Sequence, residues 1–394
     1  MDLSRCTSIK NQFFFDPDGF NTYCCESVPP NTPERKQFKL QDWDAKRAYE
    51  LDLYQKSKDN WLEECLLCKY NEDKFGDSLR TRANRDHDEF DNDFIQTAII
   101  KTSNHCNMGC RMCEPSLSTF WQKVVRKHPS KEFHDDAYQL DEPTDPEMEI
   151  LKDKVFTEHL HNIVFSGGES LLSKKNYEII EHLLSTGHCK NIALHITTNG
   201  SVKIKDAWLD ASKHFKQFTM EFSIDGGGHV YEYIRPGASW DKLVDVINYT
   251  KHVAPDTEWL FNYVAQALNA HCMDNDERMI MGLFDGVELN DPEWVDHLSV
   301  CHNGPEDSYV VVHPKLRTKY GINYYADEFE YCEETYAKFL RKMAWLDRAH
   351  GTSLEKLNPD FFDTSLYPQS AMDVYKAYVE SGKWIHEKNY NLHR

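Results

Sequence analysis

The chain has 394 residues, of which 40% are apolar and 28% are charged, a composition typical of a globular protein with room for two or three domains. Its formal net charge of −20 argues against a surface for non-specific nucleic-acid binding, which requires concentrated Lys and Arg. No apolar run approaches the length needed to span a bilayer. We therefore expect neither a membrane-embedded nor a disordered protein.

Cysteine is abundant, with 12 residues in the chain. The first residues, 1–6, lack the basic and then apolar pattern of a secretory signal. Cysteines in a chain without an export signal favour metal ligation in a reducing compartment over a disulfide framework. We therefore expect a cytoplasmic, metal-binding protein.

The first segment, residues 1–93, is irregular, acidic and rich in turn residues. Its apolar run at 13–15 predicts a short strand that enters a tight turn, with a return strand over 21–25. A helix is expected over 43–62. The segment thus brings a hairpin and a C-x2-C pair into one small domain.

Four thiolates of this segment can close a four-cysteine site, namely those of Cys6, Cys24 or Cys25, Cys65 and Cys68. A small domain with little apolar pattern would gain stability from a bound metal. Zinc and an iron–sulfur cluster both accept four thiolates, so the ligand set does not choose between them. The alternative is that some of these cysteines are incidental.

From residue 94 onward, strand patterns alternate with helix patterns. Strands are expected over 95–101, 161–166, 191–198, 217–224 and 258–267, with a sixth over 296–300 or 309–313. Helices are expected over 116–127, 146–161, 175–186, 207–214 and 240–252. Repeated strand–helix units predict an α/β fold with a parallel sheet, closed as a complete or partial barrel. In such folds the active site gathers at the carboxyl ends of the strands.

The last part of the chain, residues 301–394, is expected to be a mostly helical extension after a barrel domain over 94–300. An amphipathic helix is predicted over 329–350, with Gly351 as its stop. Cys332 is expected in the core. We find no chemistry in this extension.

Cys106, Cys110 and Cys113 are spaced C-x3-C-x2-C directly after the first barrel strand. Three thiolates on one small loop suit an iron–sulfur cluster in which one iron has no protein ligand, and that iron is a place for chemistry. A structural zinc site prefers four closed ligands in two separated pairs. His105 is a poor fourth ligand because it adjoins Cys106.

Polar and glycine-rich motifs follow the next strands. They are Gly167-Gly168-Glu169 after the second, Thr198 and Asn199 after the third, and Ser223 and Asp225 after the fourth. Glycines let backbone groups approach a ligand. The alternative for each motif alone is a tight turn or a helix cap.

Together, the three-cysteine loop and these strand-end motifs resemble the radical S-adenosylmethionine (SAM) superfamily over roughly residues 94–270. The resemblance implies a partial (β/α)6 TIM-like barrel. It also implies a [4Fe–4S] cluster on Cys106, Cys110 and Cys113, with SAM as the ligand of the fourth iron.

The resemblance also implies residue roles. The turn of Gly167, Gly168 and Glu169 binds the methionyl amino group. The polar residues at the ends of the third and fourth strands bind the ribose or carboxylate of SAM, and these are Thr198, Asn199, Ser223 and Asp225. Met112 packs against the adenine, as a flexible thioether can. Arg235 reaches the SAM carboxylate through a forked contact or forms a surface salt bridge. Gln266 and Asn269 are weaker candidates for the adenine or substrate end.

The spacing Cys6-x12-Gly19-x4-Cys24, followed by Cys65-x2-Cys68, is similar to part of the SPASM/twitch auxiliary-cluster domain. In the best-known members that domain follows the barrel, whereas here it precedes it. The resemblance implies an auxiliary iron–sulfur cluster in the N-terminal segment.

The implied activity is reductive cleavage of SAM to a 5′-deoxyadenosyl radical that abstracts hydrogen from a substrate, by analogy a peptide or protein side chain. An electron donor such as a flavodoxin or ferredoxin is the implied partner. Two alternatives remain open at this point. One is radical modification of a nucleotide, sugar or RNA, and the other is a non-catalytic iron–sulfur or zinc scaffold that binds a partner protein.

Overall fold

The centre of the protein is one parallel sheet of seven strands whose order in space follows their order in the chain. A computed structural model describes residues 6–15, 24, 38–58, 60–87, 93–130, 143–283, 298–300, 311–321 and 331–383. The strands are β1 (Gln12–Phe15), β2 (Thr97–Ile100), β3 (Asn162–Phe165), β4 (Ala193–Thr198), β5 (Gln217–Ser223), β6 (Glu258–Ala265) and β7 (Leu298–Val300). All neighbouring pairs are parallel.

The open parallel sheet is that of a partial TIM-like barrel, so the predicted fold class is confirmed. In β2, β3 and β4 every second residue is buried, which gives the sheet one face packed on the core. The sixth predicted strand lies at Leu298–Val300. In the other candidate, 309–313, the first two residues lie outside the described part of the chain, and the described residues Val311 to His313 lie in no strand.

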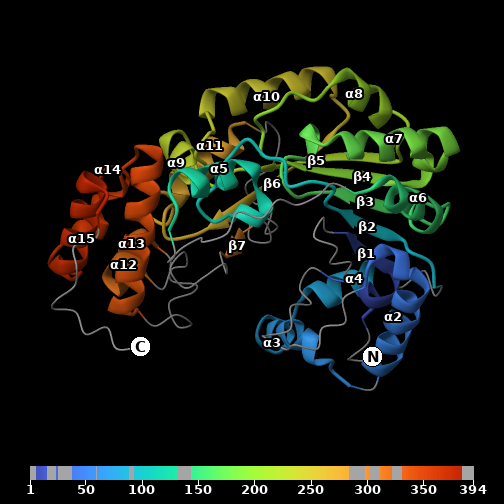
Figure 1. Cartoon of the computed structure of the whole chain (residues 1–394), viewed down its shortest axis with the longest axis horizontal. Coiled ribbons are helices and arrows are strands. Elements are labelled where there is room, and N and C mark those ends of the chain that lie inside the picture. Colours follow the sequence, from blue (N-terminus) through green and yellow to red (C-terminus); the bar gives the residue numbers. More distant parts are fainter. Residues whose placement is uncertain are drawn as a thin grey trace.

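Helices follow the barrel strands and cover the outside of the sheet (Figure 1). They are α5 (Thr119–Lys127), α6 (Asp145–Lys154), α7 (Lys174–Thr186), α8 (Asp206–Ser212), α9 (His229–Ile234), α10 (Trp240–Val253) and α11 (Met273–Met281). Serine hydroxyls begin three of them, since Ser118, Ser173 and Ser239 each accept a backbone N–H of the first turn.

The N-terminal segment contributes β1 to the barrel sheet. The expected strand at 13–15 is present, but it pairs in parallel with β2, with Phe13 opposite Ala98. The expected return strand over 21–25 lies outside the described residues except for Cys24, which is in no strand. The domain boundary after residue 93 stays a prediction, although the sheet crosses it.

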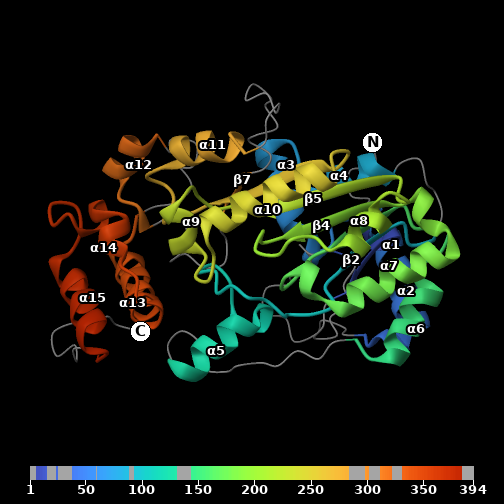
Figure 2. The same cartoon turned by 90° about the horizontal axis from the view of Figure 1, so that it is seen from above.

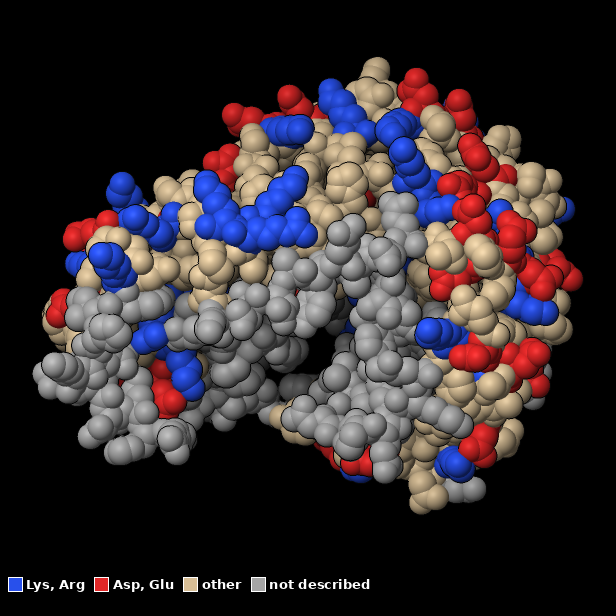
Figure 3. Space-filling model, in the orientation of Figure 1, with Lys and Arg blue, Asp and Glu red and all other residues tan. Residues whose placement is uncertain are grey.

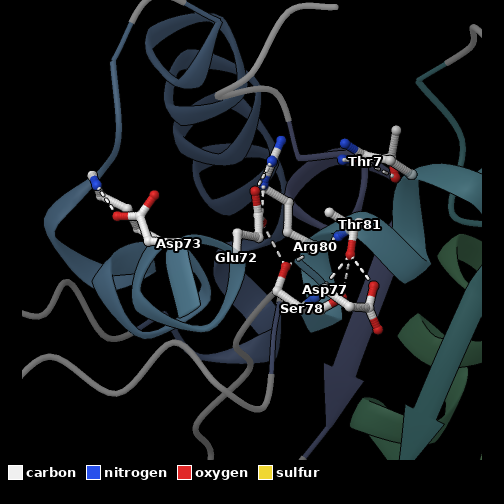
Figure 4. A network of polar contacts seen from close by, with 9 residues as sticks. Thr7, Glu72, Asp73, Asp77, Ser78, Arg80 and Thr81 are labelled. Carbon is white, nitrogen blue, oxygen red and sulfur yellow. Dashed lines mark hydrogen bonds and ion pairs between the residues drawn. The ribbon is translucent and has the colours of Figure 1, made fainter. Parts of the chain in front are cut away.

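Short helices complete this segment, namely α1 (Ser8–Asn11), α2 (Trp43–Ser57), α3 (Leu66–Phe75) and α4 (Leu79–His87). Residues of α1, α2 and α4 contribute to a small apolar cluster that includes Cys6, Cys24 and Leu53. Figure 4 shows the polar contacts that tie α3 to α4, in which Arg80 Nε and Ser78 Oγ both donate to Glu72 Oε1, at 2.8 and 2.6 Å. This segment therefore has a core of its own beside the main one.

The C-terminal helices lie at the opposite end of the molecule from the N-terminal segment, beside α9 (Figure 1). They are α12 (Pro314–Tyr320), α13 (Glu333–His350), α14 (Leu354–Leu357) and α15 (Gln369–Ser381). Figure 2 shows α13 next to α5, and Trp345 stacks on Trp121 with ring centroids 5.9 Å apart. Gly351, at φ +70°, ends α13 as predicted. Cys332 is exposed, so its expected place in the core is wrong.

In the described part of the chain, no helix combines the length and the apolar character needed to cross a bilayer.

Candidate active site at the carboxyl ends of the strands

The cysteine loop, residues 101–118, follows the carboxyl end of β2 and is anchored through its backbone. Gly109 N donates to Pro236 O and Arg111 N to Ile234 O, each at 2.8 Å. The indole N–H of Trp121 donates to Cys110 O, also at 2.8 Å. The loop is thus held from two sides, by α5 and by the segment that ends α9.

Cys106, Cys110 and Cys113 are free thiols in this loop. Burial raises the pKa of each thiol, that of Cys110 to about 11. The charge of Cys106 raises the pKa of Cys110 further, and the charges of Cys110 and Cys106 raise that of Cys113. The three sulfurs therefore lie near enough to influence one another. Their protons must leave when a metal centre binds.

Two hydrogen-bond donors point at these sulfurs. Asn199 Nδ2 lies 3.7 Å from Cys106 Sγ, and Arg235 Nη1 lies 3.5 Å from Cys110 Sγ. Hydrogen bonds to thiolate sulfurs stabilise an iron–sulfur cluster and tune its potential. The chemistry of the donor set therefore fits a cluster on these three cysteines.

Gly167 and Gly168 both have positive φ, at +75° and +40°. A Cβ on Gly168 would lie 2.6 Å from His105 O and 2.9 Å from Ser103 O. Next to them, Glu169 N donates to His105 O at 2.8 Å. The glycines therefore allow the turn after β3 to pack directly on the backbone of the cysteine loop.

The carboxylate of Glu169 is buried and holds the ends of β3 and β4 together. It accepts bonds from Thr198 Oγ1 at 2.8 Å, from Asn199 N at 2.7 Å and from Leu171 N at 3.1 Å. Burial raises the pKa of Glu169, while these donors oppose that shift. Thr198, expected to face a ligand, instead has its hydroxyl bonded to Glu169.

Asp225 is also fully engaged within the protein. Its Oδ2 accepts from Arg235 Nε at 2.7 Å and its Oδ1 from Val264 N at 2.9 Å. Both partners of the ion pair are buried, so the surface salt bridge considered for Arg235 is wrong. Asp225 thereby holds the guanidinium that faces Cys110.

Gln266, directly after β6, offers an unused donor. It is 1% exposed, and its Nε2 has no hydrogen-bond partner in the structure as described. Its neighbour Asn269 is fully used in the turn, because its Nδ2 donates to Val264 O at 2.8 Å and its Oδ1 accepts from Gln266 N at 2.8 Å. A buried amide without a partner is costly and suggests a ligand group opposite it.

The two remaining expected residues lie at the same rim. Ser223 ends β5 opposite Asn262 of β6 and is half-buried. Met112 is half-buried against the core.

Two polar residues of the loop that were not predicted as site residues, Asn107 and Arg111, join it to other elements. Asn107 Oδ1 accepts from Asn199 Nδ2 at 3.0 Å and from Ser201 Oγ at 3.0 Å. Arg111 Nη2 donates to Asp347 Oδ1 at 2.9 Å across the boundary to α13. The one sequence signal for Asn107 and Arg111 is that both lie between cysteines of the loop.

In the N-terminal segment, Cys6, Cys24 and Cys68 are buried and Cys65 is half-buried. Burial raises the pKa of Cys6, and the nearby charge of Cys68 adds to the rise. Cys25 lies outside the described residues. Among the residues that are described, no three His, Cys, Asp or Glu side chains are placed to hold a single metal ion. In an iron–sulfur cluster each thiolate binds a different iron, so a cluster does not need such a single-ion site. The four-cysteine centre stays a prediction.

The fold and the rim together define an α/β protein with a thiol-lined site at the carboxyl ends of its strands. Residues 100–264 match the family described as the Radical SAM superfamily. This match confirms the predicted resemblance to that superfamily over this part of the chain. No curated protein matches the chain.

Among solved structures, that of hexahistidine-tagged anSMEcpe with bound AdoMet is similar at 15% identity and a TM-score of 0.39, over 73% of this chain and 65% of that one. The structure of Streptococcus suis SuiB bound to precursor peptide SuiA is similar at 14% identity and a TM-score of 0.36, over 79% of this chain and 69% of that one. The chain thus spans about 65% of the length of the first of these.

Proposed function

We propose that this protein is a radical SAM enzyme whose [4Fe–4S] cluster is held by Cys106, Cys110 and Cys113. The observation that carries the proposal is the group of three half-buried thiols with two donors, Asn199 and Arg235, directed at two of their sulfurs. When bound, the cluster supplies the electron for reductive cleavage of SAM, after which a hydrogen atom is removed from a substrate. The chain's own residues position the reactants and exclude water.

For SAM, the best-supported contacts are backbone groups at Gly167 and Gly168, the thioether of Met112 and the free amide of Gln266. Asn199 and Ser223 lie at the same rim. We assign a structural role to four residues that bond to one another or to the backbone, namely Glu169, Thr198, Asp225 and Arg235. This division changes the roles that the superfamily resemblance implies for these four residues.

The proposed substrate is a peptide or protein side chain, and the proposed auxiliary centre uses Cys6, Cys24, Cys65 and Cys68. Both rest on the cysteine spacing of the N-terminal segment. A flavodoxin or ferredoxin is the proposed electron donor.

The test is anaerobic reconstitution of the full chain, followed by iron and sulfide analysis and a dithionite-driven assay for 5′-deoxyadenosine. We expect a loaded cluster and SAM cleavage, both lost in Cys110→Ala. A matched control is Cys189→Ala, because Cys189 is a buried thiol of the core outside the rim. This variant should retain iron and cleavage.

Two outcomes would contradict the proposal. One is retention of cleavage by Cys110→Ala. The other is the absence of 5′-deoxyadenosine from a properly loaded wild-type protein, with or without candidate peptides, which would favour a non-catalytic scaffold.

A further inference from the structure

Helix α5 has one buried face and one strongly cationic face. Trp121, Val124 and Val125 are buried against the core. Lys123, Arg126 and Lys127 are exposed, and their spacing of three and four residues places them together on the outer side of the helix. Figure 3 shows a group of Lys and Arg side chains over α5. We refer to these three residues as the α5 basic face.

The α5 basic face is unusual in a chain with a formal net charge of −20. Within the described residues, none of its three side chains forms an ion pair. Surface lysines elsewhere do, as Lys56 does with Asp52 at 2.6 Å and Lys213 with Asp210 at 2.9 Å. The α5 basic face therefore presents positive charge that the described part of the chain does not neutralise.

The same helix holds the cysteine loop. Ser118, which caps α5, donates through Oγ to Met108 O at 2.7 Å, and Trp121 donates to Cys110 O at 2.8 Å. The cationic face and the loop thus lie on opposite sides of one helix, about 10 Å in diameter. A protein bound on α5 would lie next to the three cysteines.

We propose that the α5 basic face is the docking surface for an acidic electron-donor protein that reduces the centre held by the cysteine loop. This inference rests on the proposed function. The reduced donor gives up one electron and is oxidised, and the centre behind α5 takes that electron up. Opposite charges on two protein surfaces speed their encounter and set their orientation.

The compact size of the patch favours a protein over a nucleic acid. A long polyanion would extend beyond the patch onto the acidic surface of this chain, where it is repelled. An acidic protein can meet three cations with a few carboxylates and contact little else.

The experiment compares two charge-reversal variants of the full, anaerobically reconstituted chain. The first is K123E/R126E/K127E. The control is K190E/K213E/K216E, which changes the net charge by the same amount. Its three lysines are exposed and lie near the amino ends of β4 and β5, at the opposite rim. The probe is a purified acidic flavodoxin, and its affinity is measured by calorimetry at low and at physiological ionic strength.

We expect the α5 variant to lose about tenfold or more in affinity, and the control to change much less, because local complementarity adds to net charge. Flavodoxin-driven SAM cleavage should fall with affinity, whereas dithionite-driven cleavage should be unchanged. Equal effects in both variants, no effect in the α5 variant, or no binding by the wild-type chain would overturn the proposal. The proposal would also be overturned if the α5 variant lost binding to RNA while its binding to flavodoxin stayed intact.

The dithionite assay separates this inference from the proposed function. If the wild-type chain binds flavodoxin but does not cleave SAM with dithionite, the proposed function fails and the docking surface stands. If dithionite drives cleavage and the α5 variant behaves as wild type with flavodoxin, only the docking surface fails.

Discussion

Arg111, which lies between two cysteines of the loop, donates to Asp347 of α13 at 2.9 Å, and each residue is 1% exposed. Arg111 also donates to Thr352 Oγ1 at 2.6 Å. On the other side, Asp347 accepts from Tyr375 OH at 2.6 Å and from Leu354 N at 2.7 Å. Through these contacts, the C-terminal helices support the loop that carries the cysteines.

Asp347→Asn should lower the free energy of unfolding by about 3–5 kcal/mol, because it leaves the buried charge of Arg111 without its partner. Urea denaturation checks this. Asp210→Asn breaks an exposed pair with Lys213 and should cost no more than about 1 kcal/mol. Similar costs for the two variants would contradict a role for the buried pair.

Gly168→Ala should reduce both stability and iron content after reconstitution, because its Cβ would lie 2.6 Å from His105 O. Gly187→Ala is a matched control, since Gly187 has φ +72° and no neighbouring atom within 4 Å of a Cβ. The control should show only the backbone strain of about 1–2 kcal/mol and normal iron content. Equal iron loss in both would mean that crowding of the loop is unimportant.

The paired replacement Asp225→Asn with Arg235→Gln should lower the reduction potential of the reconstituted centre. The replacement removes the guanidinium beside Cys110, and a nearby positive charge favours the more negative, reduced state. Changing both residues avoids leaving one buried charge unpaired. Spectroelectrochemical titration measures the shift. Asn199→Ala, which removes a neutral donor from Cys106, should lower the potential less, and an unchanged potential in both variants would contradict this role.

Acidification should destabilise the fold through His350. Burial lowers the pKa of His350 to about 4, and the charge of Arg111 contributes, whereas an unfolded histidine titrates near 6.5. The unfolded state therefore binds the proton first, so stability is fully present above about pH 6.5 and is lost as the pH falls toward 4. His350→Gln should flatten this dependence in urea denaturation between pH 7 and pH 5. A slope equal to that of the wild type would show that His350 does not titrate in this way.

The barrel could be predicted from the sequence because its strands and helices have strong apolar periods and end in polar or glycine-rich turns. The pairing of β1 could not, because a short apolar strand such as Phe13–Phe15 carries no signal for its partner. The contact of Arg111 with Asp347 could not be predicted either, because it joins a loop and a helix that are far apart in the sequence.

Residue types also gave the location of the candidate site better than the role of each side chain. The prediction put Glu169, Asp225 and Arg235 at one rim, where the structure has them. The hydrogen bond between Arg235 and Asp225, and the bonds of Glu169 and Asp225 to the backbone, could not be foreseen, because they depend on register and on the path of the backbone. Cys332 was misjudged since it caps the start of α13 and is therefore exposed.

The pairing of β1 with β2 has a consequence for how this architecture can be divided. β1 occupies the edge of the sheet beside β2, so a fragment that starts at residue 94 would present the unpaired N–H and C=O groups of β2 to solvent, a template for aggregation. The N-terminal segment and the barrel therefore cannot be separated or exchanged as independent domains. A fusion or truncation that is meant to isolate the barrel has to keep residues 12–15.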